Sequence, residues 1–451
     1  MNTPPRITVI GTGYLGATHA AAMAESGYDV LGVDVDAGKV AALARGEVPF
    51  YEPGLSELLE SNVAAGRLRF ATDFAEAAEF GDIHFIAVGT PQRARTNAAD
   101  LSQIDAAIGS LAPLLTRPCT VVGKSTVPVG TAQDLQTRLQ SLAPAGADVH
   151  LVWNPEFLRE GFAVADTLTP DRIVIGLADP AGPGQPPHAD EEVMRQVYAP
   201  MIEWGSPFLV MDYPTSELVK VAANSFLATK ISFINAMAEV CEATGADVTL
   251  LAQAIGHDER IGSKFLRAGV GFGGGCLPKD IRAFMARAGE LGVSDALSFL
   301  RDVDGINSRR RASTVALARE LVGGRFVGKR ITVLGAAFKP DSDDVRDSPA
   351  LDIAAAIYTA GGDVVVHDPQ ALANAEVAYP TMAYATDISE ALTGADLVLV
   401  LTEWRDYTDL DPASVVSLPD DPSVLDGRNC LDVGRWRAAG WTYRGLGRPN
   451  A

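Results

Sequence analysis

A glycine-rich turn lies between a short apolar strand and a helix within the first 34 residues. Residues 6–10 (RITVI) have the composition of a buried strand, and Gly11-Thr12-Gly13-Tyr14-Leu15-Gly16 follows directly. An Ala-rich helical pattern from Ala17 to Ser26 leads to a second strand at residues 29–34. This order predicts a βαβ unit with parallel strands, which restricts the first part of the chain to an α/β fold.

The glycine spacing matches the dinucleotide-binding fingerprint in the context that makes it informative. Gly11 allows a tight turn, Gly13 lets the backbone approach a pyrophosphate, and Gly16 lets the helix pack closely on the strand. Asp34, 18 positions beyond Gly16, would bind ribose hydroxyls and repel a 2′-phosphate. We therefore expect NAD as the cofactor. The alternative is a turn that needs glycine only for its conformation.

The remaining pattern predicts a second α/β region after a helical middle. Strands are expected at 83–88, 120–123 and 151–153, and again at 331–334, 363–367, 397–401 and 430–433. One long helix is expected from Tyr213 to Thr244, and residues 246–310 are expected to be helical except for a glycine-dense loop at 269–275. The fold class is therefore two Rossmann-like, doubly wound α/β domains (1–212 and 311–451) joined by a long central helix and a helical region (213–310).

Charge and cysteine content narrow the functional class. The 37 basic and 57 acidic residues give a net charge of −20, which argues against a nucleic-acid partner. No apolar run approaches the length of a membrane span, so no membrane partner is expected. The four cysteines and six histidines are scattered without metal-binding spacing, so we expect no metal site and a cytoplasmic, reducing location.

The segment from Gly269 to Asp280 (GVGFGGGCLPKD) is the most unusual in the chain. Its glycines are costly to order unless the backbone must fold tightly around something. Asp280 resembles an N-cap, which would put Cys276 just before a helix and three residues from Lys279, where a thiolate is stabilised. A stabilised thiolate and a dinucleotide site in the same chain suggest aldehyde oxidation through a thiohemiacetal and a thioester. The other three cysteines lie in apolar stretches and are interpreted as core residues.

Several polar residues are candidates for supporting roles. Lys220 and Asn224 share one face of the long helix and suit charge stabilisation, although a solvated lysine is the common alternative. Residues 154–161 and 124–128 follow strands, where ligands bind in such sheets, and one of their side chains is a candidate for positioning water. Lys339 and Arg346 are candidate phosphate contacts, with a solvated loop charge as the alternative.

Together these segments resemble the nucleotide-sugar 6-dehydrogenase family. The resemblance is carried, in the family's order, by GTGYLG (11–16), VGTP (88–91), KSTVPVGT (124–131), NPEFLREGFAVADTLTPDRIVIG (154–176), ELVKVAANSFLATKISFIN (217–235), RIGSKFL with GVGFGGGCLPKD (260–280) and AFKPDSDDVRDSP (337–349). It covers nearly the whole chain. It implies a four-electron oxidation of UDP-glucose to UDP-glucuronate with two NAD, and a homodimer formed through the central helix.

The resemblance also implies roles for individual residues. Cys276 would be the nucleophile, Lys220 and Asn224 would stabilise charge, and Glu160, Thr126 and Asp280 would handle water and protons. The residues implied in NAD binding are Gly11, Gly13, Tyr14, Leu15, Gly16, Asp34, Lys39, Thr90, Thr126, Glu160, Lys279 and Arg346. Those implied in binding the UDP-sugar are Glu156, Phe157, Leu158, Arg159, Glu160, Lys220, Asn224, Phe265, Gly273, Phe338 and Lys339, with Arg260 reaching a neighbouring subunit's substrate.

Some alternatives stay open from the sequence. The chain departs from the family pattern at Leu15, where Val is usual, and at Gly275, where Ser is common. Segments 154–161 and 273–280 are also compatible with GDP-mannose 6-dehydrogenases, whereas residues 426–429 and 443–448 look like the UDP-glucose type. Two further interpretations are a two-electron 3-hydroxy-acid dehydrogenase and a non-catalytic nucleotide-binding sensor. The water-activating base is either Glu160 or Asp280.

Overall fold

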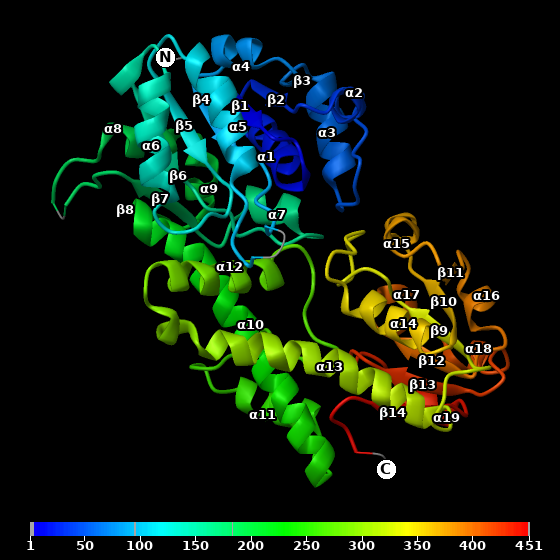
Figure 1. Ribbon diagram of the computed structural model, residues 1–451. Helices are drawn as coiled ribbons and strands as arrows, with labels where there is room; N and C mark the ends of the chain where they lie inside the picture. Colours follow the sequence, from blue (N-terminus) through cyan, green and yellow to red (C-terminus); the bar gives the residue numbers. More distant parts are fainter. Residues whose placement is uncertain (1–3, 94–95, 183, 450–451) are drawn as a thin grey trace. The chain divides into compact units, whose positions relative to one another are not determined.

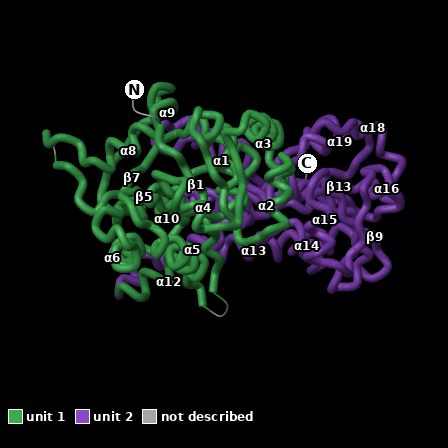
Figure 2. The backbone as a smooth tube through the Cα atoms, turned by 90° about the horizontal axis from the view of Figure 1, so that it is seen from above, with its two compact units in different colours: residues 1–223, 282–291 green, residues 224–281, 292–451 purple. Residues whose placement is uncertain are grey.

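The computed structural model describes residues 4–93, 96–182 and 184–449 (Figure 1). The chain forms two compact units, coloured separately in Figure 2. The first unit comprises residues 1–223 and 282–291, and the second comprises residues 224–281 and 292–451. The chain passes from the first unit to the second within helix α10 (Tyr213–Thr244) and returns briefly through helix α12 (Leu277–Glu290).

The first unit is built on a sheet in the order β3-β2-β1-β4-β5-β6-β7-β8. Its strands are β1 (Ile7–Ile10), β2 (Val30–Val33), β3 (Leu68–Ala71), β4 (Ile83–Ile86), β5 (Cys119–Gly123), β6 (Val149–Trp153), β7 (Ile173–Leu177) and β8 (Phe208–Asp212). All neighbours are parallel except β6 and β7, which are antiparallel. The predicted strands are confirmed, and β3, β7 and β8 are additions to the prediction.

Helices cover both faces of this sheet, as the blue and cyan ribbons of Figure 1 illustrate. They are α1 (Tyr14–Glu25), α2 (Ala37–Ala44), α3 (Leu55–Ala64), α4 (Phe74–Phe80), α5 (Ser102–Leu111), α6 (Thr131–Leu142), α7 (Ala163–Leu168), α8 (Ala189–Val197) and α9 (Ala199–Trp204). Two apolar clusters, one containing Val9 and Phe85 and the other Ile10 and Ile86, are consistent with a doubly wound sheet, since successive strand residues face opposite sides.

The second unit contains a parallel sheet in the order β11-β10-β9-β12-β13-β14. Its strands are β9 (Arg330–Leu334), β10 (Asp363–His367), β11 (Ala383–Tyr384), β12 (Leu397–Val400), β13 (Ser423–Asp426) and β14 (Thr442–Gly445). Its helices are α11 (Val248–Gly256), α13 (Phe299–Leu321), α14 (Pro349–Thr359), α15 (Leu372–Ala378), α16 (Ile388–Leu392), α17 (Arg405–Thr408), α18 (Pro412–Val415) and α19 (Val433–Ala438). The predicted fold class, with two α/β sheets, is confirmed.

Two sequence predictions for this unit are wrong. Residues 430–433 do not form a strand, because Asp426 accepts the Leu431 N–H within a turn and Asp432 caps α19 by accepting the Arg435 N–H. The irregular loop expected at 269–275 is also longer than predicted, since no helix or strand is present from residue 257 to residue 276. The long helix α10 begins and ends at the predicted residues.

Candidate active site

The dinucleotide turn of the first unit needs glycine at two positions for steric reasons. A Cβ on Gly11, whose φ is +89°, would lie 2.8 Å from a Val88 side-chain carbon, and one on Gly16 would lie 1.7 Å from the Gly11 carbonyl oxygen. Gly13 differs, because a Cβ there would meet nothing within 4 Å. The turn is therefore tightly packed at Gly11 and Gly16, whereas the space beside Gly13 is open, as the approach of a pyrophosphate requires. Tyr14 begins α1 directly after this turn.

Asp34 lies at the end of β2 and is held beside the turn. Its carboxylate accepts the Thr12 backbone N–H at 2.8 Å and the Lys39 ammonium at 2.9 Å. Burial alone would raise the pKa of Asp34, but hydrogen bonds from the Asp36 backbone, Lys39 and Thr12 keep that pKa below its ordinary value. A fixed negative charge at this place fits recognition of ribose hydroxyls and disfavours a 2′-phosphate.

The second unit has an aspartate, Asp368, at the corresponding position after β10. Donors from the same unit occupy both oxygens of its carboxylate. One oxygen of Asp368 accepts the backbone N–H groups of Ala336 and Ala337 and the Trp404 indole N–H, at 2.7, 3.0 and 3.0 Å. The other oxygen accepts two further backbone N–H groups. The side chain is 2% exposed. This carboxylate therefore organises the turn after β9, which agrees with the absence of the fingerprint glycines there.

Cys276 lies immediately before α12 and is exposed. Its carbonyl accepts the Asp280 N–H at 2.9 Å, so the helix begins at Leu277, with Pro278 in the first turn. The prediction that Asp280 is the N-cap is therefore wrong, because Asp280 lies inside the first turn. Because the helix begins earlier than predicted, the Cys276 thiol is closer to the helix N-terminus than expected. The positive end of the helix dipole stabilises a thiolate at such a position.

Side chains from distant parts of the second unit order the loop before Cys276. Asn307 accepts the Phe272 N–H at 2.8 Å and donates to the Phe272 carbonyl at 2.9 Å. Asn235 accepts the Gly269 N–H at 2.9 Å, and Arg428 donates to the Gly271 carbonyl at 3.0 Å. These contacts satisfy a buried irregular backbone, which is otherwise costly. None of these three side chains could be predicted from the sequence, because single positions 34 to 157 residues from their partners carry no local signal.

The glycines of this loop are required by close packing. A Cβ on Gly273 would lie 2.2 Å from the Asp347 carbonyl oxygen, and one on Gly274 would lie 2.7 Å from the Phe338 ring. At Gly275 the space is filled by the Arg346 guanidinium, 2.4 Å from the position of a Cβ. The loop is therefore packed against residues 338–347, which contain the predicted ligand-binding residues Phe338 and Arg346. Glycine at position 275, where serine is common, therefore leaves space for the Arg346 guanidinium.

Asn224 and Asp280 are joined directly in the second unit. The Asn224 amide donates to Asp280 at 2.7 Å, and Lys279 donates to the other carboxylate oxygen at 2.7 Å. Asp280 is 2% exposed and Asn224 is 8% exposed. The structure thus brings together three predicted site residues around the buried Asp280 carboxylate, and two of them lie within four positions of Cys276 in the sequence.

Lys220, also on α10, is paired within the first unit. Its ammonium donates to Glu156 at 2.9 Å and lies 5.7 Å from the centre of the Phe157 ring. Because the two side chains are 6% and 12% exposed, the interpretation of Lys220 as a solvated surface lysine is wrong. Glu156 also accepts the Leu158 N–H at 2.8 Å, which fixes the carboxylate. A buried ion pair of this kind places a cation where it is not screened by water.

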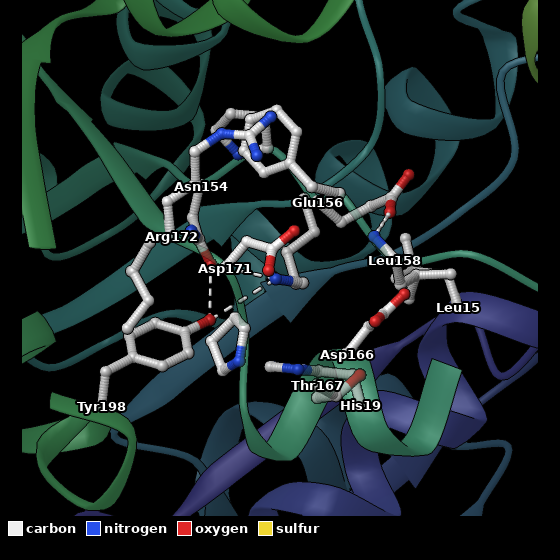
Figure 3. A pocket seen from close by; sticks show the side chains of 15 residues that line it. Leu15, His19, Asn154, Glu156, Leu158, Asp166, Thr167, Asp171, Arg172 and Tyr198 are labelled. Carbon is white, nitrogen blue, oxygen red and sulfur yellow. Dashed lines mark hydrogen bonds between the residues drawn. The ribbon is translucent and has the colours of Figure 1, made fainter. Parts of the chain in front are cut away.

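A pocket of the first unit adjoins this ion pair (Figure 3). Lys124 donates to Asn154 at 3.0 Å, and the Tyr198 hydroxyl donates to the same amide oxygen at 2.5 Å. Burial lowers the pKa of Lys124 to about 8, although Glu156 acts in the opposite direction. His19 also lines the pocket, and burial followed by the Lys124 charge lowers its pKa well below the ordinary value. Lys124 was predicted only as a member of the segment 124–128, and Tyr198 was not predicted.

The remaining candidates of the first unit lie in loops that follow strands. Thr90, after β4, donates its hydroxyl to the Thr126 carbonyl at 2.8 Å, which joins the segments after β4 and β5. Glu160 is 9% exposed and lies in the turn before α7. The Arg159 side chain is 58% exposed and forms an ion pair with Asp166.

The remaining candidates of the second unit are mostly at its surface. Arg346 pairs with Asp344 at 2.6 Å, and Lys339 lies 5.6 Å from the centre of the Phe338 ring. Arg260 pairs with Asp258, and its side chain is 88% exposed. Phe265 has a φ of 64° and is also exposed. Within residues 4–93, 96–182 and 184–449, no group of three or more His, Cys, Asp or Glu side chains is arranged to hold a metal ion.

The other cysteines differ from Cys276. Cys119 and Cys241 are buried, as predicted, and burial raises the pKa of Cys119 to about 11. Burial likewise raises the pKa of Cys430, which is partly exposed, far above its ordinary value. Neutral thiols of this kind are unreactive. Cys276 is therefore the cysteine that combines exposure with a place at the start of a helix.

Comparison with known proteins gives three consecutive family matches. The UDP-glucose/GDP-mannose dehydrogenase family matches through its NAD binding domain at residues 5–202, its central domain at 214–309 and its UDP binding domain at 332–433. The chain belongs to this family. Of the helices in the described parts of this dehydrogenase, none is long and apolar enough to cross a membrane.

Individual relatives are similar to this dehydrogenase over their whole length. The UDP-glucose 6-dehydrogenase of Rhizobium meliloti (strain 1021) is 42% identical, with 99% of this chain and 100% of that protein covered. A UDP-glucose dehydrogenase structure from Pyrobaculum islandicum has a TM-score of 0.88 at 37% identity and covers 99% of this chain and 98% of that one. A GDP-mannose dehydrogenase structure from Pseudomonas aeruginosa has a TM-score of 0.53 at 26% identity, with 98% and 99% covered.

Proposed function

We propose that this dehydrogenase oxidises UDP-glucose at C6 to UDP-glucuronate, with two NAD reduced and one water consumed per turnover. The observation that carries the proposal is the exposed Cys276 at the start of α12, in a chain whose fingerprint turn is open above Gly13. An alcohol dehydrogenase that stops at the aldehyde needs no such thiol. A four-electron oxidation needs a nucleophile that makes the aldehyde a hydride donor again.

In the first oxidation, the side chains on α10 stabilise charge at the reacting oxygen. Bound NAD supplies the hydride acceptor in both oxidations. Lys220 is positioned by Glu156 and Asn224 by Asp280, so a cation and an amide donor are fixed before substrate arrives. Preorganised donors of this kind stabilise a developing alkoxide because they need not reorient during the reaction. The alcohol proton leaves through Asp280 or Glu160.

In the second oxidation, the Cys276 thiolate adds to the aldehyde carbon and forms a thiohemiacetal. Loss of a second hydride from that carbon, with the hydroxyl proton passing to Glu160 or Asp280, gives a thioester on Cys276. Water then attacks the thioester carbonyl, the carbon–sulfur bond breaks, and the thiol and the carboxylate product are released. Glu160 or Asp280 accepts the proton of the attacking water, and Thr126 orients that water.

The UDP-sugar would be held by residues from several loops. We assign the UDP-sugar to residues 156–160, Lys220, Asn224, Phe265, Gly273, Phe338 and Lys339, with Arg260 reaching the substrate of a second subunit. GDP-mannose is the alternative nucleotide sugar. UDP-glucose is favoured because the relatives that share 37–42% identity over the full chain carry that name, whereas the GDP-mannose dehydrogenase shares 26%.

A homodimer through the central helix is supported by an apolar stripe on α10. Phe226, Phe233 and Val240 follow one another at intervals of seven residues, so they share one face of the helix. Their exposed fractions are 67%, 49% and 52%. Exposed large apolar side chains on one helix face are what a protein–protein interface would cover. A second copy of the same helix would cover it with side chains of the same kind.

We also propose a cytoplasmic location. All four cysteines are free, and Cys276 must be a thiol for the proposed chemistry. A reducing compartment maintains free thiols.

The experiment that tests the function counts the NADH formed per molecule of limiting UDP-glucose by the purified protein. Two NADH and one UDP-glucuronate are expected. A ratio of one would mean that oxidation stops at the aldehyde, as in a two-electron 3-hydroxy-acid dehydrogenase, and would contradict the thioester. No NADH from UDP-glucose or GDP-mannose, with NAD still bound, would indicate a nucleotide-binding sensor.

A further inference from the structure

Glu52, in the loop before α3, holds the backbone next to Glu160. Its side chain is almost fully buried, at 5% exposed. Its two carboxylate oxygens accept the backbone N–H groups of Gly161 at 2.6 Å and Ala163 at 2.7 Å. These N–H groups lie at the start of α7, where no carbonyl of the helix reaches them. A carboxylate that accepts two N–H groups binds more strongly than a neutral acceptor, so it fixes the turn firmly.

Tyr14 connects the same point to the dinucleotide turn. Its hydroxyl accepts the Gly161 N–H at 2.9 Å, sharing that hydrogen with Glu52. The Tyr14 ring lies 5.0 Å from the ring of Phe50, two residues before Glu52. We call these four residues, Tyr14, Phe50, Glu52 and Gly161, the Glu52 clamp. The clamp joins the start of α1, the loop before α3 and the turn before α7 into one contact network.

The backbone on the other side of Glu160 is also fixed. Arg159 donates its backbone N–H to Asp166 at 2.8 Å, and its guanidinium donates to both oxygens of the same carboxylate at 2.9 and 2.6 Å. Gly161 has a φ of +77°, a value that favours glycine and reverses the chain. Glu160 therefore lies between two anchored neighbours, and the anchor nearer the dinucleotide turn is Glu52.

We propose that Glu52 is a positioning residue that holds Glu160 in register with the dinucleotide turn. The inference rests on the proposed function, in which Glu160 moves protons and activates water. Glu52 acts through the Gly161 backbone rather than by contact with substrate. Because a displacement of a reacting group by about 1 Å costs about 10²-fold in rate, loosening the clamp lowers turnover more than substrate affinity.

The test compares Glu52→Gln with Glu160→Gln in the full-length protein. The amide introduced by Glu52→Gln keeps one oxygen acceptor but turns an NH₂ group toward one of the two backbone N–H groups, which breaks half of the clamp. We expect kcat to fall by about 10- to 100-fold with little change in the KM for UDP-glucose. If intact-protein mass spectrometry of quenched reactions detects acyl-enzyme on Cys276 in Glu160→Gln, it should also detect acyl-enzyme in Glu52→Gln. The pH profile of kcat should change in the same way in both variants.

The matched control is Asp387→Ala in the second unit. One oxygen of the Asp387 carboxylate accepts two backbone N–H groups, those of Ser389 and Glu390, at the start of α16. Alanine removes this helix cap, and the variant should retain the wild-type kcat, which separates positioning from general loss of stability.

Two outcomes would overturn the inference. Wild-type kcat in Glu52→Gln, beside a slow Glu160→Gln, overturns the positioning role alone. A wild-type chain that forms no UDP-glucuronate overturns the proposed function and this inference together. If Glu52→Gln does not fold, as judged by NAD binding and cooperative unfolding, Glu52→Asp replaces it. That variant keeps the negative charge but is one methylene shorter, so it cannot hold both N–H groups as Glu52 does, and an unchanged kcat in it also overturns the proposal.

Discussion

The Asn224 amide donates a 2.7 Å hydrogen bond to the Asp280 carboxylate. Asp280 is buried, and its other oxygen accepts from Lys279 at 2.7 Å. The Asp280 carboxylate therefore positions both the Asn224 amide and the Lys279 ammonium. In Asp280→Asn the fold is retained but the charge is lost. We expect kcat to fall by about 10²- to 10⁴-fold, the scale of a proton-transfer group, with a smaller change in KM. Steady-state kinetics with UDP-glucose measure this. A KM effect with unchanged kcat would assign Asp280 to binding only.

Replacement of the candidate nucleophile separates the two oxidations. A serine hydroxyl at position 276 is a far weaker nucleophile than a thiolate, so Cys276→Ser should lose at least about 10³-fold in UDP-glucuronate formation. Product analysis by chromatography and the NADH count check this. The matched control is Cys430→Ser, because burial keeps the Cys430 thiol neutral by raising its pKa, and that variant should turn over at the wild-type rate. Equal loss in both variants would contradict the special role of Cys276.

The parts of the fold that sequence could predict are those with a local signal. The turn at Gly11–Gly16 is specified by its own glycines, and α10 ends at Thr244, directly before a glycine at position 245. The edge strand β3 (LRFA) was missed because it has only four residues and Arg69 interrupts its apolar pattern. The strand expected at 430–433 was wrong because turn and cap hydrogen bonds outweighed its apolar pattern.

The candidate site was predictable in the same uneven way. The place of Cys276 directly before a helix could be predicted from its own loop, but the side chains that order that loop could not. Asn307 binds Phe272 from 35 residues away, and Glu52 binds Gly161 from 109 residues away. A single buried Asn or Glu in an otherwise ordinary segment carries no pattern, since only the tertiary structure brings it to its partner.

Cofactor choice should depend on Asp34. In Asp34→Ala the ribose hydroxyls lose a charged acceptor, worth about 1.5–3 kcal/mol, so NAD affinity should fall by roughly 10- to 100-fold. Lys39, which now donates to Asp34 at 2.9 Å, would be released and available to a 2′-phosphate. The ratio of kcat/KM for NAD to that for NADP should therefore decrease. An unchanged ratio would show that another residue selects NAD.

The buried Lys124 should make the stability of the protein depend on pH. Burial lowers the pKa of Lys124 from 10.5 to about 8, so between these values the unfolded chain binds more protons than the folded one. The free energy of unfolding should therefore rise with pH from about 8 to 10.5, by about 3 kcal/mol in total, and the burial cost is fully present below pH 8. Urea unfolding across this range measures the effect, and Lys124→Met should lack this rise. The exposed Lys264→Met is the control and should run parallel to wild type.

The apolar stripe of α10 makes the oligomeric state testable with one substitution. Phe233 is 49% exposed and lies midway between Phe226 and Val240, so a glutamate there would place a charge at the centre of the proposed interface. Phe233→Glu should convert a dimer to a monomer in sedimentation velocity, because a buried unpaired charge costs several kcal/mol. Val377→Glu is the matched control, since Val377 is 85% exposed in α15 of the second unit, on a different helix from the stripe. A dimer that persists in Phe233→Glu and dissociates in Val377→Glu would move the interface away from the central helix.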